Sequence, residues 1–417
     1  MERRRVVVTG IGAVTPIGHG KDGLWEGARG GKSGVKTIDR FDTSQIQSKV
    51  AGQIDDFDPL NYFDAKLTRR MDRFAQLGLA SCDMAIQDAR LKTEAKNPNS
   101  RVGVTIGTAL GGVAGAERQH EVYIKNGLRS VDPSLALTVF GGSGSSNIAI
   151  RYGLAGPSNA NSNSCTSGAI AIGEAYRYIK DGYADVMIAA GAEAPLYELT
   201  FSAFTLIRAM STNPDPNSAC RPFDKQRDGF VMGEAAAVLV LEELSGALRR
   251  DAHIYCEVLG YACNNDAHHM IAPRPDAACA IRAMSDALKE ARIQASDVGY
   301  LNAHASATLL NDKTETIAIK SVFADSVKKL PVSGTKSMHA HALGASGAVE
   351  AAICAQIFEK GILPPTIHFQ TPDPECDLDC VPNHARTARV DYILSNSFGF
   401  GGINASLVFG RFSEIGQ

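Results

Sequence analysis

The sequence lacks a strong excess of either charge, any long apolar run and any regular pattern of cysteines. Its 417 residues carry a net charge of −3, so the composition does not indicate a protein that binds nucleic acid. No apolar segment approaches the ~20 residues that a membrane-spanning helix needs, so we expect no membrane partner. The nine cysteines are odd in number and scattered, which argues against a disulfide framework and favours a reducing, cytoplasmic setting.

Signs of a metal site or of a removable leader are weak. Cys376 and Cys380 lie near His368 and His384 in the sequence, but their spacing and the lack of a second cysteine pair argue against a metal, so we predict none. The basic N-terminus followed by valines at 6–8 superficially resembles a signal peptide. A threonine and two glycines break this apolar run at once, so the segment is better interpreted as a first buried strand.

What the sequence does contain is a steady alternation of short apolar strands with helical segments. This alternation predicts an α/β protein with buried mixed sheets. The chain divides near Asp251 into two plausible halves, residues 1–250 and 251–417, although no literal sequence repeat relates them. The last two predicted strands flank a glycine loop and are expected to form a hairpin. The predicted strands cover residues 5–10, 102–107, 185–190, 236–241, 255–261, 300–304, 390–395 and 405–409, and the predicted helices cover residues 70–89, 166–181, 277–291, 313–322 and 344–358.

Cys165 lies at the junction of a strand-like segment, 157–163, and a predicted helix, in the run Asn163-Ser164-Cys165-Thr166-Ser167. The unpaired N–H groups of a helix N-terminus favour an anion. That setting is expected to lower the pKa of the thiol and to populate the nucleophilic thiolate. Most isolated cysteines are inert, small apolar residues, so the interpretation depends on what else the sequence contains.

Two histidine motifs and a glycine loop follow Cys165 in the sequence. His304 follows an apolar strand, His341 comes shortly after Lys336, and small residues beside both histidines leave room for a ligand. The loop at 395–402 has backbone amides that can donate to an oxyanion. A thiolate can attack a thioester and store its acyl group. Two neutral imidazoles that donate from Nε2 can stabilise the enolate formed when a malonyl group loses carbon dioxide, so the set fits acyl-thioester chemistry.

Over its whole length the sequence resembles the elongating, type II β-ketoacyl-acyl-carrier-protein synthases, which have the thiolase fold. The resemblance implies an α/β, layered α-β-α-β-α fold with two mixed five-stranded sheets from two similar halves. It also implies an acyltransferase that condenses an acyl group on Cys165 with malonyl-acyl-carrier protein, giving β-ketoacyl-acyl-carrier protein and CO2 in fatty-acid or polyketide elongation. The matching blocks are Arg70-Met71-Asp72-Arg73-Phe74, Ala184-Asp185-Val186-Met187-Ile188, Arg221-Pro222-Phe223-Asp224 and Arg227-Asp228-Gly229-Phe230-Val231-Met232-Gly233-Glu234.

The resemblance assigns roles to the residues of the predicted catalytic set. Cys165 is implied to be the acylated nucleophile. His304 and His341 are implied to bind the malonyl thioester carbonyl and to promote decarboxylation. Lys336 is implied to organise His304 through charge and hydrogen bonds, with Glu350 as its partner.

Further residues match family positions that support the site or contact the substrate. Phe400 matches the gate between the acyl and malonyl sites, and its backbone amide is implied to form the acyl oxyanion hole with that of Cys165. Ser306 and Thr308 match hydroxyl positions that contact the phosphopantetheine arm. The other supporting and substrate-contacting residues that the resemblance implies are Asp312, Glu315, Phe398, Gly399, Gly401 and Leu110.

The implied partner is an acyl carrier protein. Because the carrier brings the phosphopantetheine arm, the chain is expected to need no cofactor of its own. The basic side chains of Lys66, Arg69 and Arg70 are candidates for docking this acidic carrier, although a solvated helix face has the same composition. The resemblance also implies a dimer, either of two identical chains or with a ketosynthase-like subunit.

Several positions depart from the family pattern. Ala305 and Ala340 stand where glycine is usual, and His339 stands where threonine is usual. Alanine adopts a positive φ only at a cost, so the loop at 338–341 is expected to differ from that of its relatives.

Small and polar residues cluster near the expected acyl pocket. Asn159, Asn161 and Asn163 alternate along the strand before Cys165 and therefore share one face. Residues 141–146 are all glycine or serine, in a segment where the family has larger apolar side chains. We therefore hypothesise a wider or more polar acyl pocket. The alternative function is that of a ketosynthase subunit in a specialised type II polyketide or polyene pathway, acting with a paralogous partner subunit.

Two other classes of protein fit the sequence less well. Gly10 and Gly12 follow a strand as in nucleotide-binding oxidoreductases, but Thr15 stands where the third glycine of that motif belongs, and no acidic residue is evident at the expected strand end. Subunits that set chain length resemble the synthases but lack the nucleophile, so the retention of Cys165 argues against that role.

Overall fold

Two groups of five strands form the framework of the structure, a computed structural model that describes residues 4–413. β1 and β9 pair over Val6–Val8, so hydrogen bonds join the two groups into one continuous path. The first group has the order β6 (Ser158–Asn161), β5 (Val102–Gly107), β7 (Val186–Glu193), β8 (Ala235–Glu243) and β1 (Val6–Thr15). The second group has the order β11 (Val332–Ser333), β10 (Tyr300–Asn302), β14 (Tyr392–Gly399), β15 (Ile403–Gly410) and β9 (Cys256–Asn265).

The two groups share one pattern of strand directions. In the first, β1 and β8, and β8 and β7, are antiparallel, whereas β7 and β5, and β5 and β6, are parallel. In the second, β9 and β15, and β15 and β14, are antiparallel, whereas β14 and β10, and β10 and β11, are parallel. The expected hairpin is therefore β14–β15. The domain boundary near Asp251 stays a prediction.

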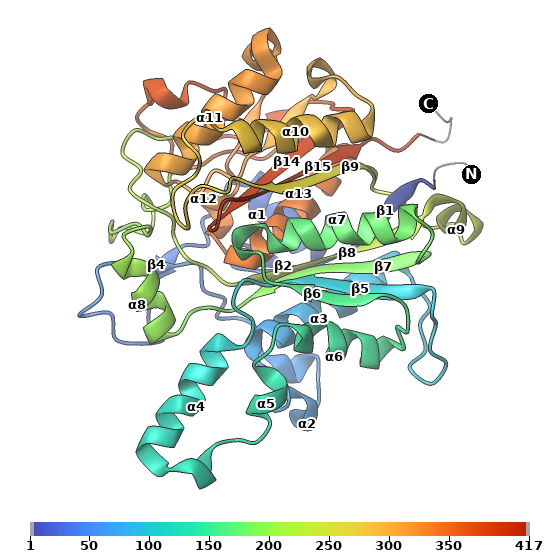
Figure 1. Ribbon diagram of the computed structural model, residues 1–417, viewed down its shortest axis with the longest axis vertical. Coiled ribbons are helices and arrows are strands. Elements are labelled where there is room, and N and C mark those ends of the chain that lie inside the picture. Colours follow the sequence, from blue (N-terminus) through green and yellow to red (C-terminus); the bar gives the residue numbers. More distant parts are fainter. Residues whose placement is uncertain (1–3, 414–417) are drawn as a thin grey trace.

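Helices complete five layers in the order α-β-α-β-α (Figure 1). α3 (Arg73–Ala89) and α6 (Gly142–Tyr152) cover the outer face of the first group. α10 (Ala278–Ala291) packs on the second group, with α11 (Leu309–Phe323) beside it. α7 (Ser167–Lys180) and α13 (Ser346–Lys360) lie between the groups and contact each other. This is the expected layered fold, in which the two sheets are also joined at β1 and β9.

The two middle helices are rich in small side chains because sheets cover both of their sides. Every residue at 346–358 in α13 is buried, as expected of a helix that is apolar all round. A Cβ atom on Gly347 would lie 2.7 Å from the backbone nitrogen of Ala169. Glycine therefore permits the close approach of α13 to α7, which brings the N-terminal ends of the two helices together. Cys165 and His341 both lie just before those ends.

The remaining elements are shorter or lie at the surface. α4 and α5 project from the body at the lower left of Figure 1. Within residues 4–413, no helix has both the length and the apolar character needed to cross a bilayer. The shorter and surface elements are β2 (Gly18–His19), α1 (Gly20–Arg29), β3 (Lys36–Thr37), β4 (Val50–Ala51), α2 (Ala65–Thr68), α4 (Val113–Asn126), α5 (Leu135–Thr138), α8 (Glu198–Leu206), α9 (Leu244–Arg249), α12 (Lys336–His339), β12 (Ile362–Leu363) and β13 (Arg386–Thr387).

Candidate active site

Cys165 lies in a tight 3₁₀ turn, η3 (Ser164–Thr166), between β6 and α7. Ser164 has φ = 55°, a left-handed conformation that a residue with a Cβ atom adopts at a cost. Two hydrogen bonds hold the turn: the Thr166 hydroxyl donates to the Asn163 carbonyl at 2.6 Å, and the Ser167 hydroxyl donates to the Ser164 carbonyl at 2.7 Å. The turn therefore fixes the position of the thiol at the N-terminal end of α7.

The Cys165 thiol rests in its protonated form. Burial raises its pKa to about 11, although the Ser164 hydroxyl, the Lys336 charge and the Phe400 backbone N–H all act to lower it. The expectation of a lowered thiol pKa is therefore wrong. The reason is that Cys165 is almost completely buried, and the cost of removing a thiolate from water exceeds the stabilisation that the surrounding donors provide.

This pKa predicts how the thiol reacts with an alkylating agent. A group with a raised pKa gains its charged form only as the pH rises toward that value, so the reactive thiolate increases about tenfold per pH unit from pH 6 to pH 9. We expect the rate of Cys165 modification by iodoacetamide to rise across that whole range, with Cys165→Ser as the unreactive control. A rate that levels off below pH 8 would contradict the protonated resting state.

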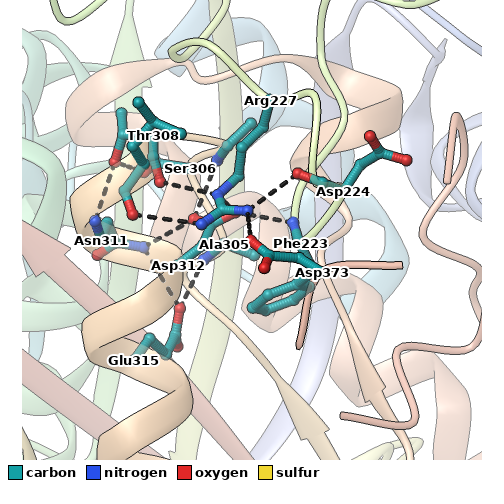
Figure 2. A network of polar contacts seen from close by, with 12 residues as sticks. Phe223, Asp224, Arg227, Ala305, Ser306, Thr308, Asn311, Asp312, Glu315 and Asp373 are labelled. Carbon is teal, nitrogen blue, oxygen red and sulfur yellow. Dashed lines mark hydrogen bonds and ion pairs between the residues drawn. The ribbon is translucent and has the colours of Figure 1, made fainter. Parts of the chain in front are cut away.

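Buried carboxylates hold the loop that carries His304 (Figure 2). Glu315 accepts hydrogen bonds from the backbone N–H groups of His304, at 2.9 Å, and Ala305, at 2.8 Å. Asp312 accepts from the N–H groups of Ala307, at 3.1 Å, and Phe223, at 2.8 Å. Ala305 and Ala307 have φ values of 41° and 66°, so these bonds hold the loop in a backbone conformation that alanine rarely adopts.

The Arg227 guanidinium ties the same loop to the segment that contains Asp373 (Figure 2). It donates to the Thr308 and Leu309 carbonyls, both at 3.3 Å, and to the Asp373 carboxylate at 2.5 Å. Ser306 and Thr308 share a hydrogen bond of 3.0 Å between their hydroxyls. The two hydroxyls predicted to contact pantetheine, those of Ser306 and Thr308, therefore lie on a loop that Arg227 holds in place through hydrogen bonds.

Lys336 lies directly behind His304 and is fully buried. Its Nζ donates to Glu350 Oε1 at 2.5 Å and to the His304 carbonyl at 2.6 Å, and it lies 3.3 Å from His304 Nδ1. An ammonium group has only donors, so Nδ1 of His304 must accept and Nε2 must carry the proton. Burial, followed by the Lys336 charge, holds the pKa of His304 well below its usual range, so the ring is neutral.

His341 lies edge-on to His304, with 5.4 Å between ring centroids. Its Nδ1 lies 2.9 Å from the Ser346 hydroxyl, and its backbone N–H donates to the Val231 carbonyl at 2.8 Å. When the Ser346 hydroxyl donates to Nδ1, the proton of the ring is on Nε2, as in His304. Burial and the Lys336 charge also hold the pKa of His341 well below its usual range.

One cavity of about 360 Å³ brings most of the predicted site residues together. Lys336, Glu350, Asp312 and Glu315 are buried behind this cavity and do not line it. Leu110 packs with Cys165 in the same apolar cluster but does not line the cavity, and neither does Gly401. The predicted residues that do line it are Cys165, His304, Ser306, Thr308, His341, Phe398, Gly399 and Phe400.

Two aromatic residues to which the sequence analysis gave no role, Phe204 and Phe230, lie in the same apolar cluster as Phe400. Phe204 stacks on Phe400 with ring centroids 6.4 Å apart and an angle of 15° between the planes. Phe204 also meets Phe230 edge-on at 6.2 Å, and Phe230 meets His341 edge-on at 5.3 Å. Phe230 belongs to a matching family block, but nothing in the sequence alone indicated Phe204.

Other predicted features lie away from the cavity. Lys66, Arg69 and Arg70 are exposed, on or just after α2, which lies across the first sheet from α11 and α12 (Figure 1). Residues 141–146 form the N-cap and the start of α6 and do not line the described cavity, so the hypothesis of a wider acyl pocket stays a prediction. In residues 4–413, no three His, Cys, Asp or Glu side chains are grouped so as to hold a metal ion.

The asparagines before Cys165 share one face, as expected. Asn159, Asn161 and Asn163 are half-buried, whereas Ala160 and Ser162, which lie between them, are exposed. The Asn161 side-chain amide donates to the Ser167 carbonyl at 3.1 Å, and that of Asn163 donates to Asn161 Oδ1 at 3.3 Å. These asparagines therefore support the turn that carries Cys165.

Comparisons with known proteins agree with this arrangement. The family model "Beta-ketoacyl synthase, N-terminal domain" matches residues 3–247, and "Beta-ketoacyl synthase, C-terminal domain" matches residues 255–370. A 3-oxoacyl-[acyl-carrier-protein] synthase 2 from Synechocystis sp. is 43% identical over 413 residues, which is 99% of both chains. One from Staphylococcus aureus strain COL is 43% identical over 411 residues, also 99% of both chains.

Solved structures of ketosynthases are similar over nearly the whole chain. The AntDE:AntF complex is described as a type II PKS acyl-carrier protein with its ketosynthase bound to the hexaketide. It matches with a TM-score of 0.89 and 35% identity, covering 99% of this chain and 100% of the other. The ishigamide ketosynthase/chain length factor matches with a TM-score of 0.92 and 34% identity over the same shares. The chain therefore belongs to the beta-ketoacyl synthase family, as an acyltransferase-class enzyme that carries out the ketosynthase condensation of fatty-acid or polyketide elongation.

Proposed function

We propose that Cys165 is the acylated nucleophile and that His304 and His341 stabilise the enolate formed by malonyl decarboxylation. The observation that carries this assignment is that all three side chains line one cavity. Both imidazoles are neutral, and His304 presents Nε2–H, so donors are in place before negative charge develops on the substrate. Lys336 and Glu350 do not line the cavity; Lys336, held by Glu350, fixes the tautomer of His304 by donating to Nδ1.

The reaction divides into two half-reactions. In the first, the Cys165 sulfur attacks the acyl thioester, and the C–S bond to pantetheine breaks. The pantetheine sulfur leaves with the thiol proton, while the N–H groups of Cys165 and Phe400 receive the oxyanion. In the second, the malonyl C–C bond breaks, CO2 leaves, and the electron pair passes to an enolate that the two imidazoles stabilise. The enolate carbon then attacks the acyl group, the C–S bond to Cys165 breaks, and the departing sulfur takes up a proton from water to restore the thiol.

This sequence of steps needs no cofactor held by the chain. Loss of CO2 itself supplies the electron pair that forms the new C–C bond, and the pantetheine arm arrives on the carrier protein. The test is to supply purified chain with an acyl-carrier protein and malonyl-carrier protein. We expect one CO2 for each β-ketoacyl product that is two carbons longer than the acyl donor. CO2 release without that product would contradict the condensation and leave only a decarboxylase.

We propose that Lys66, Arg69 and Arg70 dock the acidic carrier protein. All three side chains are exposed, on one short segment at the surface. Replacing all three with glutamate is expected to raise KM for carrier-bound substrates by about tenfold or more, because repulsion replaces attraction across the interface. Acyl-pantetheine without the carrier should react as before. Lys92→Glu, at another exposed surface position, is the matched control. An unchanged KM in the triple variant would exclude this surface.

We propose that the chain works as a dimer, with either a second copy or a ketosynthase-like partner. β6 pairs only with β5 among the described strands, so one edge of this sheet is open to another chain. Large apolar side chains on the nearby α4–α5 projection are also exposed, and a subunit interface would cover them. These residues are Tyr123, Ile124, Leu128, Leu137 and Phe140.

A specialised polyketide or polyene pathway with a paralogous partner is the second candidate. It is favoured by the similarity to the ketosynthase of a type II PKS complex and to a ketosynthase/chain length factor structure, and by the small, polar residues at 141–146. The test is the mass of the purified chain in solution, followed by its acyl-chain preference. A stable homodimer that accepts only saturated chains would favour housekeeping fatty-acid synthesis. A monomer that gains activity from a co-expressed paralogue would favour the specialised pathway.

A further inference from the structure

A fully buried carboxylate that the reaction itself does not use lies close to Cys165. Glu193 is the last residue of β7 and has no exposed surface. Its charge is near enough to the thiol to raise the pKa of Cys165. No lysine or arginine pairs with it among the described ion pairs, so its hydrogen bonds must account for its place in the fold.

Four donors from two separate loops meet on this carboxylate. From the loop after β5, the Thr108 hydroxyl and the Leu110 N–H donate to Oε1 at 3.0 and 3.1 Å, and the Ala109 N–H donates to Oε2 at 2.5 Å. From the turn after His341, the Gly344 N–H donates to Oε2 at 3.0 Å. Three backbone N–H groups on one carboxylate make a clamp that fixes the main chain of both loops.

The two loops are packed so closely that the carboxylate is their shared support. A Cβ atom on Gly344 would lie 2.3 Å from the Ala109 nitrogen and 2.7 Å from Glu193 Oε2. The turn that contains Gly344, η6 (Leu343–Ala345), contacts both β7 and η3, the turn of Cys165. Burial raises the pKa of Glu193 to about 7, which shows the cost of placing a carboxylate here without a cation.

The loop after β5 is also part of the surroundings of the thiol. Leu110 packs in one apolar cluster with Cys165 and Phe400. The Ser162 hydroxyl, three positions before Cys165, donates to the Ala109 carbonyl at 2.6 Å. A shift of this loop would therefore move the apolar wall beside the sulfur to which the acyl chain becomes attached.

We propose that Glu193 is a positioning residue for the acyl-transfer half-reaction: by clamping the Thr108–Leu110 loop to the turn at Gly344, it holds the wall of the acyl site in place. His304 does not depend on this clamp, because Lys336 and Glu315 hold it from the other half of the chain. His341 lies just before the turn that contains Gly344, but its own backbone N–H donates to the Val231 carbonyl, on a segment that Glu193 does not bond. Loss of Glu193 should therefore affect acylation more than decarboxylation.

The inference rests on acylation of Cys165 and is tested with Glu193→Gln. This variant keeps the size of the side chain but turns an NH2 group toward one pair of donors, either the Thr108 hydroxyl and the Leu110 N–H or the N–H groups of Ala109 and Gly344. The measurements are the acetylation and octanoylation rates of Cys165 from carrier proteins, and CO2 release from malonyl-carrier protein. We expect octanoylation to slow by about tenfold or more, acetylation to slow less, and CO2 release to stay within about twofold, because misplacing a wall costs most for the longer chain.

Two further variants separate positioning from loss of folding. Thr108→Val removes one of the four donors and should give the same pattern with a smaller effect. Thr105→Val is the matched control, since the Thr105 hydroxyl is also buried and also on this part of the chain, but donates to the Ala171 carbonyl at 2.9 Å. It should leave the ratio of the three rates unchanged.

The outcomes distinguish the inference from the proposed function. An equal fall of all three rates in Glu193→Gln, or no change in any of them, overturns the positioning role. A wild-type chain that forms no acyl adduct on Cys165 overturns the proposed function, and the inference with it. Wild-type acylation combined with wild-type rates in Glu193→Gln overturns the inference alone.

Discussion

Cys165→Ala is expected to lose acyl transfer by at least roughly a thousandfold while retaining malonyl decarboxylation. Removing the thiol removes the atom that stores the acyl group. The histidines stay in place, because His304 is held by Lys336 and Glu315, and His341 by Ser346. The measurement is intact-protein mass after incubation with acyl-carrier protein, beside CO2 release from malonyl-carrier protein.

A control substitution at a second cysteine tests whether loss of the acyl adduct is specific to the Cys165 thiol. Cys263 is an exposed cysteine on β9, outside the lining of the cavity, so Cys263→Ala should form the acyl adduct at the wild-type rate. An acyl adduct on Cys165→Ala, or loss of decarboxylation in that variant, would mean that Cys165 does not play the separate role proposed here.

Lys336→Met is expected to lower malonyl decarboxylation by about 10²- to 10³-fold, because it removes the donor that fixes the tautomer of His304. Methionine has a similar length but cannot donate to Nδ1, so His304 can place its proton on either nitrogen. Acylation of Cys165 should fall much less. The measurement is a comparison of CO2 release with the acylation rate in the same preparation.

The same substitution also tests the buried ion pair. Lys336 and Glu350 are both fully buried, and removing one partner of such a pair costs about 3–5 kcal/mol of the free energy of unfolding when the other stays charged. Glu350, whose pKa burial already raises to about 7, is expected to take up a proton and so reduce that loss.

A double variant separates stability from chemistry. Lys336→Met with Glu350→Gln should recover most of the lost stability in a urea titration but not the decarboxylation rate. Recovery of CO2 release in the double variant would show that Lys336 acts only by neutralising Glu350. The tautomer argument for His304 would then be wrong.

The regular elements of the interior were the most predictable part of the fold. β5 has the predicted bounds, and α7 and α10 agree with prediction to within one residue at each end. β5 and α7 are covered on both sides and carry apolar or small-residue runs, whereas α10 buries one face and shows the helical period of its apolar residues. β11 has only two residues, too few to show a period, and α4 has a single buried residue, so neither was predicted.

The structure brings most of the predicted site residues to one cavity, and the pKa directions agree with the predicted neutral imidazoles, whereas the predicted state of the Cys165 thiol was wrong. The position of Cys165 before a helix suggested a lowered thiol pKa, whereas its burial raises that pKa. The contact that fixes the tautomer of His304 comes from Lys336, which is distant in sequence and is brought close by the pairing of β10 with β11. Glu193 joins two loops from different halves of the chain, and no local pattern marks such a residue.

Peptide-level mass spectrometry of the wild-type chain tests the central claim most directly. The chain is incubated with an acyl-carrier protein, divided, and one part is then given malonyl-carrier protein before digestion. The account predicts an acyl group on the peptide that contains Cys165, and its disappearance from the second part as β-ketoacyl-carrier protein forms. An acyl group on a different cysteine, or one that stays on Cys165 after malonyl-carrier protein is added, would contradict it.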